Sequence, residues 1–160
     1  FFESWNKEKS YDLSSKSLSF VQDNHSKSRL GVIRGLHYQI PPYAQGKLVS
    51  CTRGIIFDVA VDIRKSSQTF SKWIGVELSE YNHMQLWIPE GFAHGYLVLS
   101  KSADVSYCCT CKYYPKNQNE IIWNDPFINI KWPIKKPAIS KKDANGIELN
   151  KIKNLPKWKK

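Results

Sequence analysis

The chain has 160 residues, of which 41% are hydrophobic and 13% aromatic, and its formal net charge is +10. This length and composition are enough for one compact domain with a sizeable core. No stretch is long and apolar enough to cross a membrane, since even the run IIFDVAV is interrupted by Asp58. The N-terminal residues FFESWNKEKS lack the layout of a signal peptide. We therefore expect a soluble, cytoplasmic protein with no membrane association.

The positive charge is concentrated at the C-terminus. Between Lys131 and Lys160 ten lysines are offset only by Asp143 and Glu148, so +8 of the +10 lies there. The preceding residues are nearly neutral, and no motif that reads nucleic acid accompanies the lysines. We therefore expect a domain over residues 1–145, a lysine-rich C-terminal tail over 146–160, and no nucleic-acid partner.

Apolar runs of strand length follow one another along the chain and are separated by turn residues. By residue number, the expected strands are 30–40, 47–52, 55–63, 72–78, 84–88, 94–100 and 104–111. They leave little room for long helices. The pattern predicts an all-β sandwich or barrel, whose concave interior is a usual place for a ligand.

The four cysteines do not form a paired framework, and three of them fall in the strand-like run YCCTCKYY. A zinc site would need a second pair of ligands at metal-like spacing, which the sequence lacks. Reduced thiols are therefore expected for the cysteines, which are Cys51, Cys108, Cys109 and Cys111.

The stretch RGLHYQIPPYAQGKLV places a histidine and a lysine on either side of a proline-rich connection. His37 closes one expected strand and Lys47 opens the next, so both can face one cavity. Histidine is suited to proton transfer near neutral pH, and a nearby ammonium can stabilise an enolate. The pair therefore suggests an enzyme that removes a proton next to a carbonyl. A core histidine beside a solvated lysine is the alternative.

A second stretch, WIPEGFAHG, resembles the second motif of the cupin superfamily, whose members are small jelly-roll barrels. Its last histidine is His94. The first cupin motif normally offers two histidines one residue apart for a metal, but only His37 stands at the matching place. We therefore expect no metal. A site built from His37, His94 and Glu90 is the alternative.

The resemblance extends to ordered blocks along residues 1–145, namely FFES, VQDNHSKS, GVIRGLHYQ, AQGKLV, FDVAVDIRK, SQTF, QLWIPEGFAHG, IIWNDP and IKWP. These blocks resemble the dTDP-4-dehydrorhamnose 3,5-epimerase family, in family order. The resemblance implies an all-β, cupin-type jelly roll with short C-terminal helical segments. It also implies a homodimeric isomerase, without metal or cofactor, that inverts carbons 3 and 5 of dTDP-4-dehydro-6-deoxy-D-glucose in dTDP-L-rhamnose and cell-surface polysaccharide synthesis.

Four catalytic residues follow from the resemblance. His37 falls on the family's base, Lys47 on its oxyanion-stabilising lysine, and Tyr107 on its general acid. Asp143 falls on the aspartate that orients the base. Two alternatives stay open, because a strand tyrosine usually belongs to the core, and because Ser140-x-x-Asp143 also fits a helix-capping box.

Substrate contacts follow in the same way. Arg34 matches the family's diphosphate ligand, and a guanidinium fits phosphate oxygens. Tyr113 matches the aromatic that stacks on thymine, although Tyr114 lies beside it. The full set is Glu3, Gln22, Asn24, Arg34, His94, Tyr113 and Lys142. For each of the polar residues, an ordinary turn or surface role is the alternative.

The sequence leaves two alternative functions open. The first is a related nucleotide-sugar cupin that acts at a single carbon or as a ketoisomerase. The second is a catalytically silent sugar-binding jelly roll. The sequence also departs from the family near Gln118, where the family often has a glutamate, although Glu120 is close.

Overall fold

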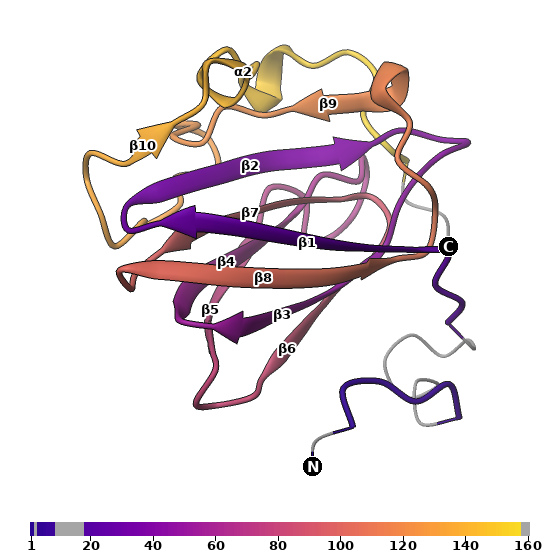
Figure 1. The fold of residues 1–160 in the computed structure, drawn as a ribbon. Helices are drawn as coiled ribbons and strands as arrows, with labels where there is room; N and C mark the ends of the chain where they lie inside the picture. The colour runs from indigo at the N-terminus through magenta and orange to yellow at the C-terminus, as the bar shows by residue number, and fades with distance from the viewer. Residues whose placement is uncertain (2, 9–17, 158–160) are drawn as a thin grey trace.

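The computed structural model describes residue 1, residues 3–8 and residues 18–157. Its described strands form two sheets that face one another (Figure 1). The first sheet has the order β1-β8-β3-β6, with β1 at Gln22–Arg29, β8 at Ser102–Cys109, β3 at Lys47–Arg53 and β6 at Gln85–Ile88. All its neighbouring strands are antiparallel.

The second sheet has the order β10-β2-β7-β4-β5, and β9 pairs with β2 beyond this path. Only β10 and β2 are parallel. Its strands are β10 (Ala138–Ile139), β2 (Val32–Gln39), β7 (Phe92–Val98), β4 (Ile55–Asp62), β5 (Trp73–Ser79) and β9 (Gln118–Glu120). The described residues also form three short helical segments, η1 (Pro115–Asn117), α2 (Lys141–Ala144) and η2 (Leu149–Lys151). The expected all-β jelly roll with short C-terminal helices is confirmed.

Both faces of the second sheet are buried, because each face packs on its own apolar cluster. Successive side chains of a strand point to opposite faces. On β4, Ile56 and Ala60 point between the two sheets, while Val59 and Val61 point to the outer side. The inter-sheet cluster comprises Val49, Cys51, Ile56, Ala60, Leu78, Ile88, Tyr96, Val98, Ala103 and Val105. Because both faces of β4 are buried, side chains that point either way are mostly apolar, and IIFDVAV is a nearly continuous apolar run.

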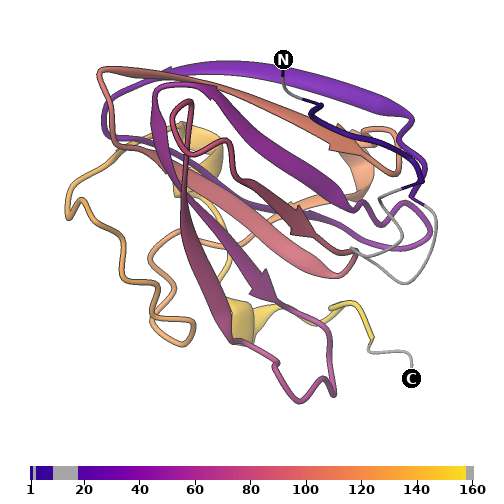
Figure 2. The same cartoon turned by 90° about the horizontal axis from the view of Figure 1, so that it is seen from below.

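The C-terminal segment covers the outer side of the second sheet. Leu149 is buried in the outer apolar cluster, and Ile152 and Leu155 pack against it. In Figure 2 the segment, drawn in yellow, returns toward the loop after β4, where the backbone N–H of Lys65 donates to the carbonyl of Pro156 at 2.7 Å. Three apolar side chains of this segment, Leu149, Ile152 and Leu155, are thus packed, whereas Ile147 and the lysines at 151, 153 and 157 are exposed. Residues 158–160 lie outside the described residues.

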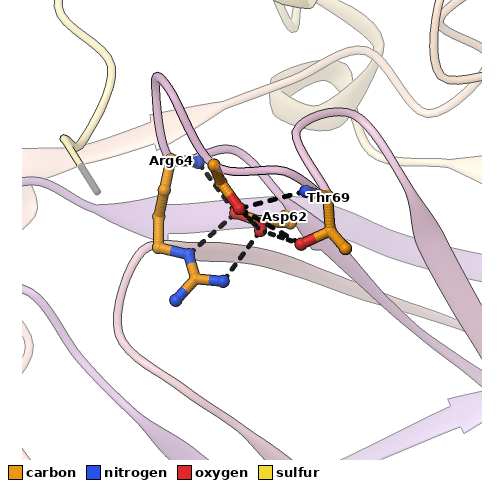
Figure 3. Close-up of polar contacts among 4 residues, drawn as sticks. Asp62, Arg64 and Thr69 are labelled. Atoms are coloured by element: carbon orange, nitrogen blue, oxygen red, sulfur yellow. Dashed lines mark hydrogen bonds and ion pairs between the residues drawn. The ribbon is translucent and has the colours of Figure 1, made fainter. Parts of the chain in front are cut away.

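A polar cluster closes the loop between β4 and β5 (Figure 3). The buried carboxylate of Asp62 accepts from Nε and Nη2 of Arg64, both at 2.8 Å. The hydroxyls of Ser67 and Thr69 also donate to it, each at 2.6 Å. Burial alone would raise the pKa of Asp62, but these hydrogen bonds outweigh it and hold the pKa well below its usual range. Both oxygens of this carboxylate therefore have partners.

All four cysteines are free thiols, as expected. In the part of the chain that the structure describes, no helix is long and apolar enough to cross a membrane.

Candidate active site

Polar side chains occupy one end of the space between the sheets. Each lies an even number of residues along its strand from a member of the inter-sheet cluster, so its side chain also points into the space between the sheets. β3 contributes Lys47, β4 contributes Asp58, and β7 contributes His94. β8 contributes Tyr107 and Cys109. The jelly roll thus places charged and ionisable groups beside an apolar core.

His37 and Asp143 form a hydrogen-bonded pair at the edge of this region. Nε2 of His37 lies 2.6 Å from Oδ1 of Asp143, and their side chains are 28% and 6% exposed. A carboxylate only accepts hydrogen bonds, so Nε2 donates and the other ring nitrogen is left to take up a proton. Burial would raise the pKa of Asp143, but the hydrogen bond and charge of His37 outweigh it and lower the pKa.

Asp143 takes part in both the helix cap and the contact with His37. Ser140 is the N-cap of α2, and its hydroxyl accepts from the backbone N–H of Asp143 at 3.0 Å. The side chain of Asp143 is left to reach His37. The two alternatives for the Ser140-x-x-Asp143 pattern are therefore compatible, since one uses the backbone and the other the carboxylate.

Close approach of β2 and β7 brings His37 opposite His94. The two residues are paired in register, next to a register shift between Arg34 and His37. Gly35 has φ +118°, and a Cβ there would lie 2.6 Å from Cα of Gly95. Only glycine fits this crossing, so the sequence RGLH serves the geometry of the site.

His94 is hydrogen-bonded to Asp58 on the neighbouring strand β4. Its Nε2 lies 2.8 Å from Oδ1 of Asp58, and the side chains are 7% and 0% exposed. Burial lowers the pKa of His94, against the opposing charge and hydrogen bond of Asp58, which favours the neutral imidazole near pH 7. The second carboxylate oxygen of Asp58 is buried and has no hydrogen-bond partner among the described residues.

Lys47 and Tyr107 lie together on the first sheet. The Lys47 ammonium is 5.9 Å from the centroid of the Tyr107 ring. Burial lowers the pKa of Lys47, and the nearby Cys109 and Asp58 side chains oppose that shift. Burial also raises the pKa of Tyr107, so its phenol keeps its proton at neutral pH. His37 belongs to one sheet and Tyr107 to the other, which places an imidazole and a phenol on opposite layers.

Several of the expected substrate contacts are linked to one another on the first sheet. Gln22 accepts from the backbone N–H of Tyr113 at 2.8 Å and donates to Oδ1 of Asn24 at 2.8 Å. Asn24 in turn donates to the sulfur of Cys109 at 3.4 Å. The expected acid, Tyr107, is the register partner of Asn24. The polar chain therefore runs from the loop after β8 to the interior cluster.

The two neighbouring tyrosines differ in their surroundings. The ring of Tyr114 lies 3.7 Å from that of Tyr43, so one of its faces is already covered. The side chain of Tyr113 is 46% exposed and lies within electrostatic reach of Tyr107 and Lys142. This difference favours Tyr113 over Tyr114 as a stacking platform.

The remaining expected contacts lie at or near the surface. Arg34 is exposed, its Nε donates to Ser28 at 2.9 Å, and its charge reaches Tyr107. Lys142 forms an ion pair with Glu120 at 2.9 Å. Glu3 lies on the exposed N-terminal segment, where it accepts from the amide of Asn6 at 3.2 Å.

Two features of the site were not found from the sequence. Glu120 also accepts from Gln118 at 2.8 Å, so it is the hub of a Gln118–Glu120–Lys142 group. Asp58 was noticed only as an interruption of an apolar run. A carboxylate inside a buried strand is rare unless it is paired, and that rarity is the signal that would have found it.

No group of three His, Cys, Asp or Glu side chains that could hold a metal ion occurs among residues 3–8 and 18–157. His37 and His94 each bind an aspartate instead, namely Asp143 and Asp58. The alternative third ligand, Glu90, lies 3.5 Å from the hydroxyl of Thr110.

The jelly roll, with an imidazole and a phenol on facing sheets, defines the class as a cupin-type epimerase. A family model described as dTDP-4-dehydrorhamnose 3,5-epimerase matches residues 1–151. The chain belongs to the dTDP-4-dehydrorhamnose 3,5-epimerase family.

Individual relatives agree with this assignment. The dTDP-4-dehydrorhamnose 3,5-epimerase of Shigella flexneri is 56% identical over 146 residues, which are 91% of this chain and 81% of that protein. A dTDP-6-deoxy-D-glucose-3,5-epimerase from Legionella pneumophila, crystallised with dTDP-4-keto-L-rhamnose, has a TM-score of 0.95 at 47% identity and covers 100% of this chain and 86% of that chain. A 3'-monoepimerase from Streptomyces bikiniensis, crystallised with dTDP-quinovose, has a TM-score of 0.87 at 30% identity, over 92% of this chain and 75% of that chain.

Proposed function

We propose that this protein inverts carbons 3 and 5 of dTDP-4-dehydro-6-deoxy-D-glucose to give dTDP-4-dehydro-L-rhamnose. The observation that supports it best is the placement of His37, paired with Asp143, on one sheet and of the protonated Tyr107 phenol on the other. Inversion requires a proton to leave one face of the sugar and another to arrive on the opposite face. Membership of the family and the two 3,5-epimerase relatives support the substrate.

Each inversion proceeds in two proton transfers. His37 takes the proton from a carbon next to the keto group, and the electron pair of the broken C–H bond moves to the carbonyl oxygen as an enolate. The Lys47 ammonium stabilises that oxygen. Tyr107 then donates its proton to the opposite face of the carbon as the carbonyl re-forms. Solvent removes the proton from His37 and restores that of Tyr107 before the second carbon reacts.

Asp143 acts through His37. Its hydrogen bond fixes the ring orientation and stabilises the imidazolium that forms when the base takes a proton. The capped α2 helix holds the carboxylate in place.

The nucleotide part of the substrate is bound at the edge of the barrel. Arg34 binds the diphosphate, since its exposed guanidinium provides several donors. Tyr113 stacks on thymine. The remaining contacts with the nucleotide sugar come from Glu3, Gln22, Asn24, His94 and Lys142.

The protein also acts as a homodimer in the cytoplasm. The family resemblance and the nucleotide-sugar substrate support this part of the proposal. Light scattering coupled to gel filtration tests the dimer, since a monomeric mass would contradict it.

A single-carbon epimerase is the second candidate, because the 3'-monoepimerase of Streptomyces bikiniensis shares the fold. Proton NMR of the substrate in deuterated water separates the candidates. We expect loss of the signals at carbons 3 and 5, with inverted product. Exchange at one carbon would indicate a monoepimerase or a ketoisomerase, and exchange at neither would indicate a silent sugar-binding protein.

A further inference from the structure

The second carboxylate oxygen of Asp58 is buried without a hydrogen-bond partner among the described residues, and the acid–base residues do not explain it. Asp58 is completely buried on β4 and faces the inter-sheet space between Ile56 and Ala60. Its Oδ1 is bonded to His94 at 2.8 Å, whereas Oδ2 is buried without a hydrogen-bond partner among the described residues. An ionised oxygen in such a place is unfavourable unless a nearby positive charge compensates for it.

The positive charge comes from the opposite sheet. Lys47 lies on β3, two residues before Val49 of the inter-sheet cluster, and therefore points into the same space. Its ammonium forms no ion pair within 4.0 Å of any described carboxylate, yet the charge of Asp58 acts on it. The two groups thus face each other across the barrel without direct contact.

The other titratable groups that face Lys47 are uncharged near pH 7. On β8, burial raises the pKa of the Cys109 thiol to about 11 and raises that of Tyr107. On β7, burial lowers the pKa of His94, which favours the neutral ring. The apolar register partner of Lys47 on β6 is Ile88. Of the groups that act on the ammonium, Asp58 is therefore the one that supplies negative charge.

His37 on β2, paired with Asp143 on α2, completes the surroundings. His37 lies opposite His94, and its charge also acts on that ring. His37 has its own carboxylate in Asp143. The two aspartates thus act on different residues: Asp143 is bonded to His37, whereas Asp58 is bonded to His94 and its charge acts on Lys47.

We propose that Asp58 is a positioning residue, in which Oδ1 fixes the His94 ring and Oδ2 supplies the counter-charge of the Lys47 ammonium. This inference rests on the proposed function for the role of Lys47. Burial favours the neutral amine of a lysine, and a neutral amine stabilises an enolate oxygen poorly. Asp58 offsets the effect of burial, so Lys47 stays charged over the pH range in which His37 acts as a base.

The direct test is an NMR titration of the Lys47 side chain in the unliganded protein, with its signal assigned by loss in Lys47→Met. In Asp58→Asn, which keeps the shape but removes the charge, the midpoint should fall by on the order of one pH unit, or about tenfold in the protonation equilibrium. Asp62→Asn is the matched control, because Asp62 lies on the same strand but is paired with Arg64. The control should leave the Lys47 midpoint in place, and an unchanged midpoint in Asp58→Asn would overturn the proposal.

A reciprocal measurement keeps the proposal testable if Asp58→Asn does not fold. Linkage requires that removal of the ammonium raise the midpoint of Asp58 by the same amount. The carboxylate carbon of Asp58 should therefore titrate at higher pH in Lys47→Met than in the wild type, and an equal midpoint would refute the coupling. Both titrations are independent of turnover, so absence of epimerase activity would contradict the proposed function alone. Where turnover is present, the alkaline limb of the kcat profile should move to lower pH in Asp58→Asn.

Discussion

Asp58 and Asp62 lie on the same face of β4, four residues apart, and both are almost completely buried. Asp62 is surrounded by donors from Arg64, Ser67 and Thr69, which occupy both of its oxygens. Asp58 has one partner and one buried oxygen left over. A fully satisfied carboxylate stabilises a loop, whereas a partly satisfied one marks a region arranged for another task.

The same contrast separates the two regions around these residues. The hydrogen bonds of the Asp62 carboxylate all join residues of one segment, 62–69. The side-chain hydrogen bond of Asp58 crosses to His94 on the neighbouring strand β7, and the charge of Asp58 acts on Lys47 on β3. Substitutions in the first region should change stability, and substitutions in the second should change chemistry.

The largest effect on proton exchange is expected for His37→Ala, near Asp58 and His94. Without the imidazole, proton exchange at carbons 3 and 5 should fall by a factor of roughly 10³ to 10⁴, the upper part of the range for a positioned base. Binding of dTDP should persist, because the expected nucleotide contacts lie elsewhere. Exchange is followed by NMR and binding by calorimetry. Wild-type exchange in this variant would show that His37 is only structural.

Asp62→Asn should show the opposite behaviour. The substitution breaks the buried ion pair between Asp62 and Arg64, and we expect a loss of about 3–5 kcal/mol in the free energy of unfolding. The kcat of the folded enzyme should be unchanged. Urea unfolding and steady-state kinetics measure the two quantities, and a variant with full stability would refute the structural role of this cluster.

The acid dependence of stability follows from the same residue. The folded-state pKa of Asp62 is lowered, so its contribution is fully present above the unfolded value of about 3.9 and is lost as the pH falls toward the folded value. The wild type should therefore lose more stability between neutral pH and pH ~3 than Asp62→Asn does. Equal losses would contradict this assignment.

A smaller effect on turnover is expected for Asp143→Asn. The amide keeps the size of the side chain but loses the charge that stabilises the protonated base, which should lower kcat about 10- to 100-fold. The helix cap should survive, because Ser140 bonds to the backbone N–H of residue 143. Comparison with Ser140→Ala, which removes the cap and keeps the carboxylate, separates orientation of the base from helix stability. Equal kcat in wild type and Asp143→Asn would contradict the role.

The smallest effect is expected for metal removal. His37 and His94 are bonded to aspartates, so neither is part of a three-ligand group among the described residues. Turnover should survive exhaustive chelation unchanged. Loss of turnover with EDTA, restored by one divalent ion, would contradict this expectation.

Much of the fold could be predicted from alternating apolar runs. The runs that include Ile56 and Val105 mark strands because β-branched residues recur in them between turn residues. The strand β1 was missed, since QDNHSKSR has no apolar alternation. Among the described strands it pairs with β8 at the edge of the sheet, and its half-buried face carries the polar side chains of Gln22, Asn24, Ser26 and Ser28 instead of apolar ones.

The site was predictable only in part. His37 and Lys47 stood out because a short connection brings them together, but Asp143 is 106 residues away from His37 and was found by its block in the family pattern. Asp58 was missed, because its role depends on partners from β3 and β7. A pairing across two sheets leaves no local pattern in the sequence.

Tyr107→Phe tests the central claim most directly, namely that proton removal and proton return come from opposite sheets. The phenylalanine keeps the ring and its packing but removes the acid. We predict that the variant still incorporates deuterium into the substrate on the original face, because His37 is intact, while inverted product falls by a factor on the order of 10² to 10⁴. NMR in deuterated water measures both quantities in one sample. Inverted product at the wild-type rate would contradict this claim and show that Tyr107 is only a core residue.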